Sequence, residues 1–290
     1  MVSVRREPDR PCTFVGNLVP GPKGRIFGGQ LIGQAVMAAS ATVEDISERL
    51  AHSLHTYFVR AGDASLPIHY DVETIRDGRS FSVRGIRANQ KGRLLLTATM
   101  SFHATRVGLE HQTRISGRYP DPEDLPNANQ GRRTFGSDID RFGHRDSVEL
   151  RRVPSELDPG TSGDNARQSL WLRARGATAR PNHTDAVSSA ALAMATDFTV
   201  LESVIFRHGL TLSTPGLSLA SLDHSMWWHA PAGLDEWLLY VQESPWAGGE
   251  RGLVVGRLYN RGGELVASVA QEGMIRVPAS EIVVKAHDAR

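Results

Sequence analysis

The sequence predicts an α+β fold built from two repeats, each with a central helix wrapped by an antiparallel sheet. Two segments have the residue spacing of buried helices, and each is followed by a run of strand-like segments. The second run repeats the order of the first, and GRLLLTATMSF from Gly92 aligns without gaps against GELVASVAQEG from Gly263. A chain of 290 residues is long enough for two such units.

The first repeat is expected to begin with a short strand and a helix. Residues 11–20 predict the strand, and the helical pattern starts after Phe27, with Gly28 and Gly29 at its entrance. The apolar stripe of this helix recurs at spacings of three and four residues, which buries one face. It consists of Ile32, Val36, Ala39, Val43 and Ile46.

Four strands in an antiparallel meander are expected to follow this helix. Side chains of alternating polarity, with many β-branched and aromatic residues, predict them at residues 53–60, 68–76, 80–89 and 93–103. Asp77-Gly78 and Lys91-Gly92 mark tight turns between them. We therefore assign residues 1–105 to the N-terminal repeat.

A polar connection is expected to separate the two repeats. Pro, Asp, Arg, Gly and Asn crowd residues 106–145, and the C-terminal repeat is assigned to residues 146–290. Within that repeat, strands are predicted at residues 147–153 and 169–175. A second helical stripe follows, formed by Val187, Ala191, Met194, Phe198 and Leu201.

Composition excludes several classes of protein. The chain has 33 basic and 32 acidic residues, so its net charge of +1 provides no field for binding nucleic acid or an anionic membrane. The single Cys12 rules out an intrachain disulfide framework and a cysteine-based zinc site. Since no apolar signal segment, no membrane-length apolar run and no C-terminal targeting signal is found, we expect a soluble cytoplasmic protein.

Motifs of common catalytic and cofactor sites are missing from the sequence. It contains no G-x-S-x-G nucleophile elbow, no H-E-x-x-H zinc motif and no phosphate-binding glycine loop. A serine hydrolase of the α/β type is therefore not expected. Neither is a metal or a nucleotide cofactor.

The two repeats differ at positions where the second carries polar groups. Counting by twos from Leu265 places Gln271 on an otherwise apolar, inward row, whereas its counterpart in the aligned first repeat is Met100. The same comparison places Asp197 opposite Ala41, while Ser221 lies opposite Ser53, so this hydroxyl is common to both repeats and the second gains a carboxylate and an amide. Because a buried polar group costs free energy unless it has partners, these differences predict one functional site, in the second repeat.

Several motifs together resemble the acyl-CoA thioesterase II family. They are FGGQLIGQAV, LHTYFVRAGD, YDVETIRDGRSFSVR, LDHSMWWH, EWLLY and VASVAQEG, and they cover roughly residues 13–105 and 166–277. The resemblance implies a double hotdog fold and a catalytic Asp, hydroxyl and Gln that position a water molecule for attack on a thioester. By motif these are Asp197, Ser221 and Gln271, with serine where some relatives have threonine.

The resemblance also implies that acyl-CoA is the substrate and that no cofactor is needed. His55 matches a family histidine and is either structural or a second polar group near the substrate. Backbone N–H groups of Gly28 and Gly29 are candidate donors to the developing oxyanion. We expect a homodimer or homotetramer, because large sheets leave edges and faces to cover.

Some alternatives remain open at the level of sequence. Asp223 and His224 suggest a dyad, but adjacent strand residues point to opposite faces, so we treat both as structural. Trp227 and Trp228 are either packing residues or part of an acyl-binding wall. Four arginines are either solvated or bind the phosphates of coenzyme A: Arg60, Arg76, Arg79 and Arg84.

Two other functions are compatible with the same scaffold. A non-catalytic acyl-CoA-binding protein is the main alternative, but binding alone does not need a carboxylate poised to accept a proton. A hydratase of the hotdog type finds no support, because no Asp/His pair has a suitable helical context.

Overall fold

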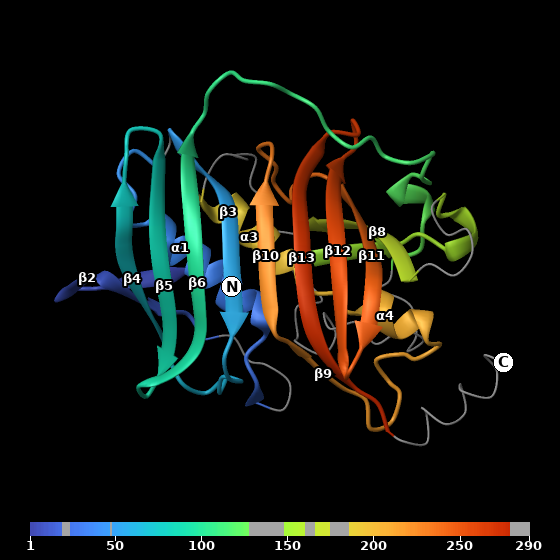
Figure 1. The fold of residues 1–290 in the computed structure, drawn as a ribbon, viewed down its shortest axis with the longest axis horizontal. Coiled ribbons are helices and arrows are strands. Elements are labelled where there is room, and N and C mark those ends of the chain that lie inside the picture. The colour runs from blue at the N-terminus through green and yellow to red at the C-terminus, as the bar shows by residue number, and fades with distance from the viewer. Residues whose placement is uncertain (19–23, 47, 128–147, 160–165, 175–185, 279–290) are drawn as a thin grey trace.

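The computed structural model of the chain describes residues 1–18, 24–46, 48–127, 148–159, 166–174 and 186–278. These residues form one continuous antiparallel sheet of 13 strands (Figure 1). The strands are β1 (Val4–Glu7), β2 (Arg10–Gly16), β3 (Arg49–Phe58), β4 (Ile68–Asp77), β5 (Phe81–Gln90), β6 (Arg93–Ala104), β7 (Val148–Arg152), β8 (Ala166–Ala174), β9 (Ser218–Ser221), β10 (Asp223–Trp228), β11 (Leu238–Gly248), β12 (Arg251–Asn260) and β13 (Leu265–Arg276).

The strand order is symmetric about the centre of the sheet. It runs β1-β2-β4-β5-β6-β3-β10-β13-β12-β11-β8-β7, with β9 paired to β13. The two halves meet where β3 pairs with β10, in a register that places His55 opposite Ser225. Each half therefore contributes the same series of strands on its own side of this seam, as the internal repeat predicts.

Two long helices lie behind the sheet, as Figure 1 shows, and contact each other. They are α1 (Gly28–Ser40) and α3 (Ala186–Thr196), and shorter helices are α4 (Glu202–Arg207) and the 3₁₀ turns at Pro122–Asp124 and Ser155–Leu157. The helices approach closely at glycine, because a Cβ atom on Gly29 would lie 2.5 Å from the Met194 carbonyl oxygen. None of the helices in the described part of the chain is long and apolar enough to cross a membrane.

Both predicted helices end earlier than their apolar stripes. The helix α1 stops at Ser40, before Val43 and Ile46, and α3 stops at Thr196, before Phe198 and Leu201. The stripe residues beyond α3 are buried all the same, because Phe198 stacks on Phe27 and Leu201 packs over Gly273. An apolar stripe therefore indicates which residues are buried, but buried residues can lie in a turn as well as in a helix.

The strands predicted by residue range agree with the structure within a few residues, and β1 and α4 are among the elements that were not predicted. The strand β1 has the sequence VRRE, in which no apolar alternation is visible, and α4 is a single short helix after the turn that follows α3. The Lys91-Gly92 turn is confirmed, since both residues have positive φ angles, +47° and +73°.

Strand register corrects one detail of the predicted repeat. In the first half, Leu54 lies opposite Met100. In the second half, Met226 lies opposite Val269, and two residues further along the same register His224 lies opposite Gln271. Likewise Ser221 lies opposite Gly273, as Ala51 lies opposite Phe102. The counterpart of Ser221 is therefore Ala51 rather than Ser53, because pairing Ser221 with Ser53 by sequence similarity alone was two residues out of the structural register.

The hydrophobic core lies between the sheet and the helices and includes residues of both halves. A second apolar cluster lies on the outer face of the second half, where part of the connection covers strands β8, β11 and β12. Its core residues are Leu125, Val153, Trp171, Trp237, Leu239, Val241 and Tyr259. The connection after β6 thus supplies apolar cover to the C-terminal half, and Figure 1 shows it crossing above the sheet.

Candidate active site

The structure brings Asp197, Ser221 and Gln271 together from three elements. Asp197 directly follows the last residue of α3, Ser221 is the last residue of β9, and Gln271 lies within β13. The strands β9 and β13 are paired, with Ser221 opposite Gly273, so the serine is two residues along the sheet from the glutamine. Residues separated by up to 74 positions in sequence therefore share one small region on the inner side of the sheet.

Hydrogen bonds connect all three side chains. Gln271 donates from Nε2 to Asp197 Oδ1 and to Ser221 Oγ, at 2.9 Å each. The Ser221 hydroxyl donates to the same carboxylate oxygen of Asp197 at 3.2 Å. Gln271 is fully buried and Asp197 is nearly so, while Ser221 is partly exposed. The nitrogen of the buried amide that was unexpected on an apolar row therefore has two partners, Asp197 and Ser221.

A fourth polar residue, His224 of β10, completes this group. Its Nδ1 lies 2.5 Å from Gln271 Oε1, and its Nε2 lies 3.3 Å from the hydroxyl of Thr196, at the end of α3. Burial lowers the pKa of His224 to about 4, so the imidazole is neutral near pH 7. The sequence pattern predicted correctly that His224 and Asp223 face opposite sides, but its contact with Gln271 depends on strand pairing.

The entrance of α1 lies next to the Asp197 carboxylate. A Cβ atom on Gly28 would lie 2.8 Å from Asp197 Oδ2 and 3.2 Å from the ring of Phe58. Only a residue without a side chain allows the first turn of α1 to approach so closely. The N-terminal end of α1, which carries the positive end of the helix dipole, therefore lies beside the carboxylate.

His55 is not part of this group. Its neighbours Leu54 and Thr56 point inward and are buried, so the alternation of β3 directs His55 to the exposed outer face. There its Nδ1 lies 3.1 Å from Ser225 Oγ and its ring meets Trp227 edge to face. The expectation that His55 lies near the substrate finds no support in this arrangement, because the sheet separates it from Gln271.

The arginines that could bind phosphate have different environments. Arg84 is 1 % exposed and forms a two-pronged ion pair with Asp77, so it is a structural residue. Arg60 instead lines a cavity of about 260 Å³ together with Lys91 and Arg93. Of the four candidate arginines, only Arg84 is buried, and the other three are exposed.

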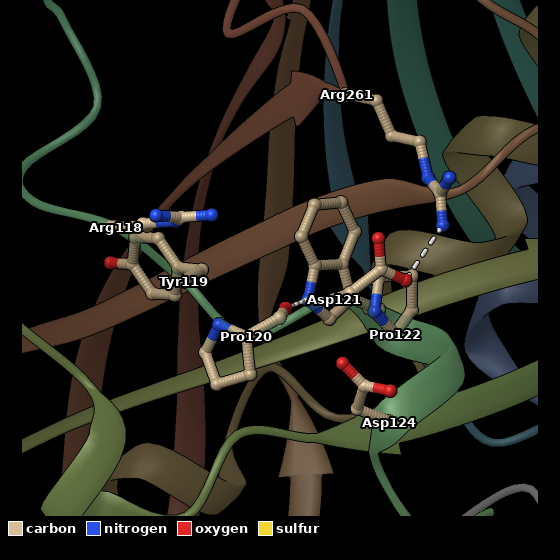
Figure 2. A pocket seen from close by; sticks show the side chains of 8 residues that line it. Arg118, Tyr119, Pro120, Asp121, Pro122, Asp124 and Arg261 are labelled. Atoms are coloured by element: carbon tan, nitrogen blue, oxygen red, sulfur yellow. Dashed lines mark hydrogen bonds and ion pairs between the residues drawn. The ribbon is translucent and has the colours of Figure 1, made fainter.

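A second cavity, of about 430 Å³, lies away from the candidate site. It is formed between the connection and the turn from β12 to β13, and Figure 2 shows Arg261 reaching toward Asp121 across it. Its lining consists of Arg118, Tyr119, Pro120, Asp121, Pro122, Asp124, Trp171 and Arg261. It contains none of the predicted site residues.

Comparisons with known proteins agree with this arrangement. Two family models match the chain, the acyl-CoA thioesterase N-terminal domain over residues 19–103 and the C-terminal domain over residues 122–275. Acyl-coenzyme A thioesterase 8 from Homo sapiens is 38 % identical over 276 residues, which are 88 % of this chain and 82 % of that protein. The chain belongs to the acyl-CoA thioesterase II family.

Bacterial members of the family are similarly close over the whole length. Acyl-CoA thioesterase 2 from Haemophilus influenzae is 32 % identical over 259 residues, 87 % of this chain and 88 % of that protein. The crystal structure of an acyl-CoA thioesterase II, TesB2, from Mycobacterium marinum superposes with a TM-score of 0.77 at 34 % identity and covers 96 % of each chain. As a member of this family, the chain is an enzyme that hydrolyses thioesters.

The fold expected for the family is also confirmed. A protein with a hot dog fold from Alicyclobacillus acidocaldarius superposes with a TM-score of 0.74 over 96 % of this chain and 97 % of that one. At 19 % identity this likeness bears on the fold alone. Together with the strand order, it confirms an α+β double hotdog for this thioesterase.

Proposed function

We propose that this thioesterase hydrolyses acyl-CoA to a free fatty acid and coenzyme A through a water molecule held and activated by Asp197, Ser221 and Gln271. The observation that carries the proposal is the hydrogen-bonded cluster of a carboxylate, a hydroxyl and an amide beside a helix entrance. The counterparts of the amide and the hydroxyl in the other half are Met100 and Ala51, which have no polar side-chain atoms. At these matched positions only the second half carries polar side chains, which supports a site there.

Asp197 is the proposed general base. It accepts a proton from water as the water oxygen attacks the thioester carbonyl carbon, and the carbon–sulfur bond breaks when the tetrahedral intermediate collapses. The departing thiolate then takes this proton from Asp197 and leaves as coenzyme A, which restores the carboxylate. Ser221 and Gln271 keep the carboxylate and the water in register, and no covalent acyl-enzyme is formed.

The oxyanion of the intermediate requires hydrogen-bond donors. The N–H groups of Gly28 and Gly29, in the first turn of α1, are the proposed donors, since the start of α1 lies beside Asp197. We assign no cofactor to this reaction. We further propose that the enzyme acts in the cytoplasm as a homodimer or homotetramer and binds neither nucleic acid nor membranes.

The test is a thiol-release assay with acyl-CoA substrates of several chain lengths. Removing the base by Asp197→Ala, or the amide by Gln271→Ala, is expected to lower kcat by about 10²- to 10⁴-fold, the usual contribution of general base catalysis. Asp223→Ala is the matched control, because this carboxylate lies on the outer face of the neighbouring strand and bonds to the Glu272 backbone N–H.

Two results would overturn the proposal. Wild-type protein that binds acyl-CoA but releases no thiol from any chain length would favour a binding protein on the same scaffold. Full activity in both Asp197→Ala and Gln271→Ala would show that the reaction occurs elsewhere in the molecule.

A further inference from the structure

His224 is a buried polar residue for which thioester hydrolysis by Asp197, Ser221 and Gln271 has no direct use. Its side chain is 0 % exposed and lies opposite Gln271 across the pairing of β10 and β13. Its counterpart in the first half is Leu54, which lies opposite Met100. An apolar pair is therefore sufficient for packing at this position of the fold, and the second half replaces both partners by polar residues.

The hydrogen bond between them has only one possible direction. The Oε1 atom of Gln271 is a carbonyl oxygen and can only accept, so Nδ1 of His224 carries the proton and donates. The other ring nitrogen, Nε2, lies 3.3 Å from the hydroxyl of Thr196, which donates its hydrogen to the Ala193 carbonyl oxygen at 2.8 Å, so the contact with Gln271 is the one that sets the tautomer. Because burial lowers the pKa of His224, the ring stays in this neutral form.

A glutamine amide can be turned over within nearly the same volume, which exchanges its oxygen and its nitrogen. In the observed orientation Nε2 donates to both Asp197 and Ser221. Turned over, the amide would point its oxygen at a carboxylate oxygen, and its nitrogen would face a donor. Asp197 and His224 therefore both favour the observed orientation, and His224 is the group that holds Oε1.

We propose that His224 is a positioning residue, which fixes the amide of Gln271 so that both of its N–H groups face Asp197 and Ser221. This inference rests on the proposed function, since it assigns His224 a part in the geometry of the same site. His224 acts only through Gln271 and does not itself touch the substrate or the water molecule.

The test compares two substitutions at one position. His224→Leu installs the residue of the first half and removes the donor. His224→Asn retains a donor, because the Asn side-chain nitrogen can occupy the place of Nδ1. We expect His224→Leu to lower kcat for thiol release by about 10- to 100-fold, the cost of a misplaced catalytic group, with KM nearly unchanged. His224→Asn is expected to recover most of the loss.

A double-substitution cycle separates positioning from packing. With Gln271→Ala already present, adding His224→Leu is expected to change kcat by less than about 2-fold, because the residue that His224 positions is missing. A packing role predicts instead that the two losses multiply. Thermal melting of each variant identifies any loss of activity that comes from unfolding, and activity is then compared below the lowest melting temperature.

Three outcomes would overturn the inference. The first is equal loss in His224→Leu and His224→Asn when both are folded. The second is that adding His224→Leu to Gln271→Ala lowers kcat by the same factor as His224→Leu does in the wild type. The third is normal kcat in His224→Leu. The proposed function fails separately, through full activity of Asp197→Ala and Gln271→Ala, whereas inactive Gln271→Ala with active His224→Leu contradicts only the role of His224.

Discussion

Gly28 illustrates how a single missing side chain shapes the candidate site. The gap between the start of α1 and the Asp197 carboxylate has no room for a methyl group, since a Cβ atom would lie 2.8 Å from Oδ2. Neither backbone strain nor a turn requires glycine here, because its φ angle is not in the left-handed region. The close approach itself is the reason for the glycine.

Gly28→Ala is therefore expected to impair catalysis more than folding. The added methyl displaces the carboxylate of Asp197 or the ring of Phe58, and a displacement of about 1 Å can cost on the order of 10²-fold in rate. Thiol release and thermal melting measure the two effects. Gly108→Ala is the control, since its Cβ would meet no atom within 4 Å. Equal kcat for Gly28→Ala and wild type would show that the helix entrance plays no part.

The second prediction at this scale concerns stability against pH. His224 has a pKa of about 4 in the folded protein and about 6.5 when unfolded, so the unfolded chain binds more protons between these values. Stability is therefore lost as the pH falls through this window. From pH 7 to pH 5 the loss due to His224 amounts to about 2 kcal/mol, at 1.36 kcal/mol per pKa unit.

Urea unfolding of wild type and His224→Leu at pH 7 and pH 5 isolates this contribution. Burial also lowers the pKa of His52 and His229, but both residues are retained in the variant and cancel in the comparison. The variant is expected to lose about 2 kcal/mol less than wild type between the two pH values. Equal losses would mean that His224 is protonated in the folded state.

The candidate site could be predicted in part, and the reason differs from residue to residue. Gln271 was recognisable because strand alternation placed an amide on an apolar row and the other repeat had Met100 there. His224 was not, because its role depends on a partner 47 residues away, across a strand pairing that no local pattern specifies. The sequence comparison also misplaced the counterpart of Ser221 by two positions, because a serine followed by a leucine occurs in both repeats and strand register is set by pairing rather than by local similarity.

At the scale of elements, the contact between α1 and α3 couples folding to the site. Gly29 is in contact with the backbone of α3 at Met194, three residues before Asp197. Any change that separates the two helices therefore moves the carboxylate as well.

Gly29→Ala is expected to reduce both stability and activity. In an exposed helix, alanine in place of glycine usually stabilises by about 1 kcal/mol. Here the sign reverses, because the methyl would lie 2.5 Å from a backbone oxygen, and overpacking of this kind costs about 1–3 kcal/mol. Urea unfolding and thiol release measure the two effects together. Increased stability in Gly29→Ala would show that the helices do not pack at this point.

The accuracy of the sequence prediction also varied between elements. Strands could be located within a few residues, because alternation and turn residues such as Lys91-Gly92 are local properties. Helix ends could not, because Phe198 and Leu201 continue the apolar stripe of α3 although the chain has already turned. The strand β1 lacked any signal, since VRRE pairs as an edge strand that buries little.

At the scale of the whole molecule, the two repeated units join where β3 pairs with β10. Their outer faces differ in how much apolar surface is covered. Over the second half, part of the connection covers Trp171, Leu239 and Tyr259. In the first half, by contrast, Tyr57 of β3 is 65 % exposed and Phe81 of β5 is 46 % exposed. The connection thus provides cover for one half, and in the other half Tyr57 remains exposed on a strand of the seam.

This asymmetry predicts that the protein associates through the outer face of β3. A symmetric dimer would bring two copies of Tyr57 near a common axis and remove both from water, which favours association. Light scattering after gel filtration is expected to give a multiple of 31.7 kDa for wild type and a smaller multiple for Tyr57→Glu. The control is Trp246→Glu, which changes another exposed aromatic residue, far along β11. Tyr57→Glu is expected to weaken the association because a buried carboxylate without a partner is costly. A monomeric wild type would contradict an interface on this face. So would a Tyr57→Glu variant with the same mass as wild type.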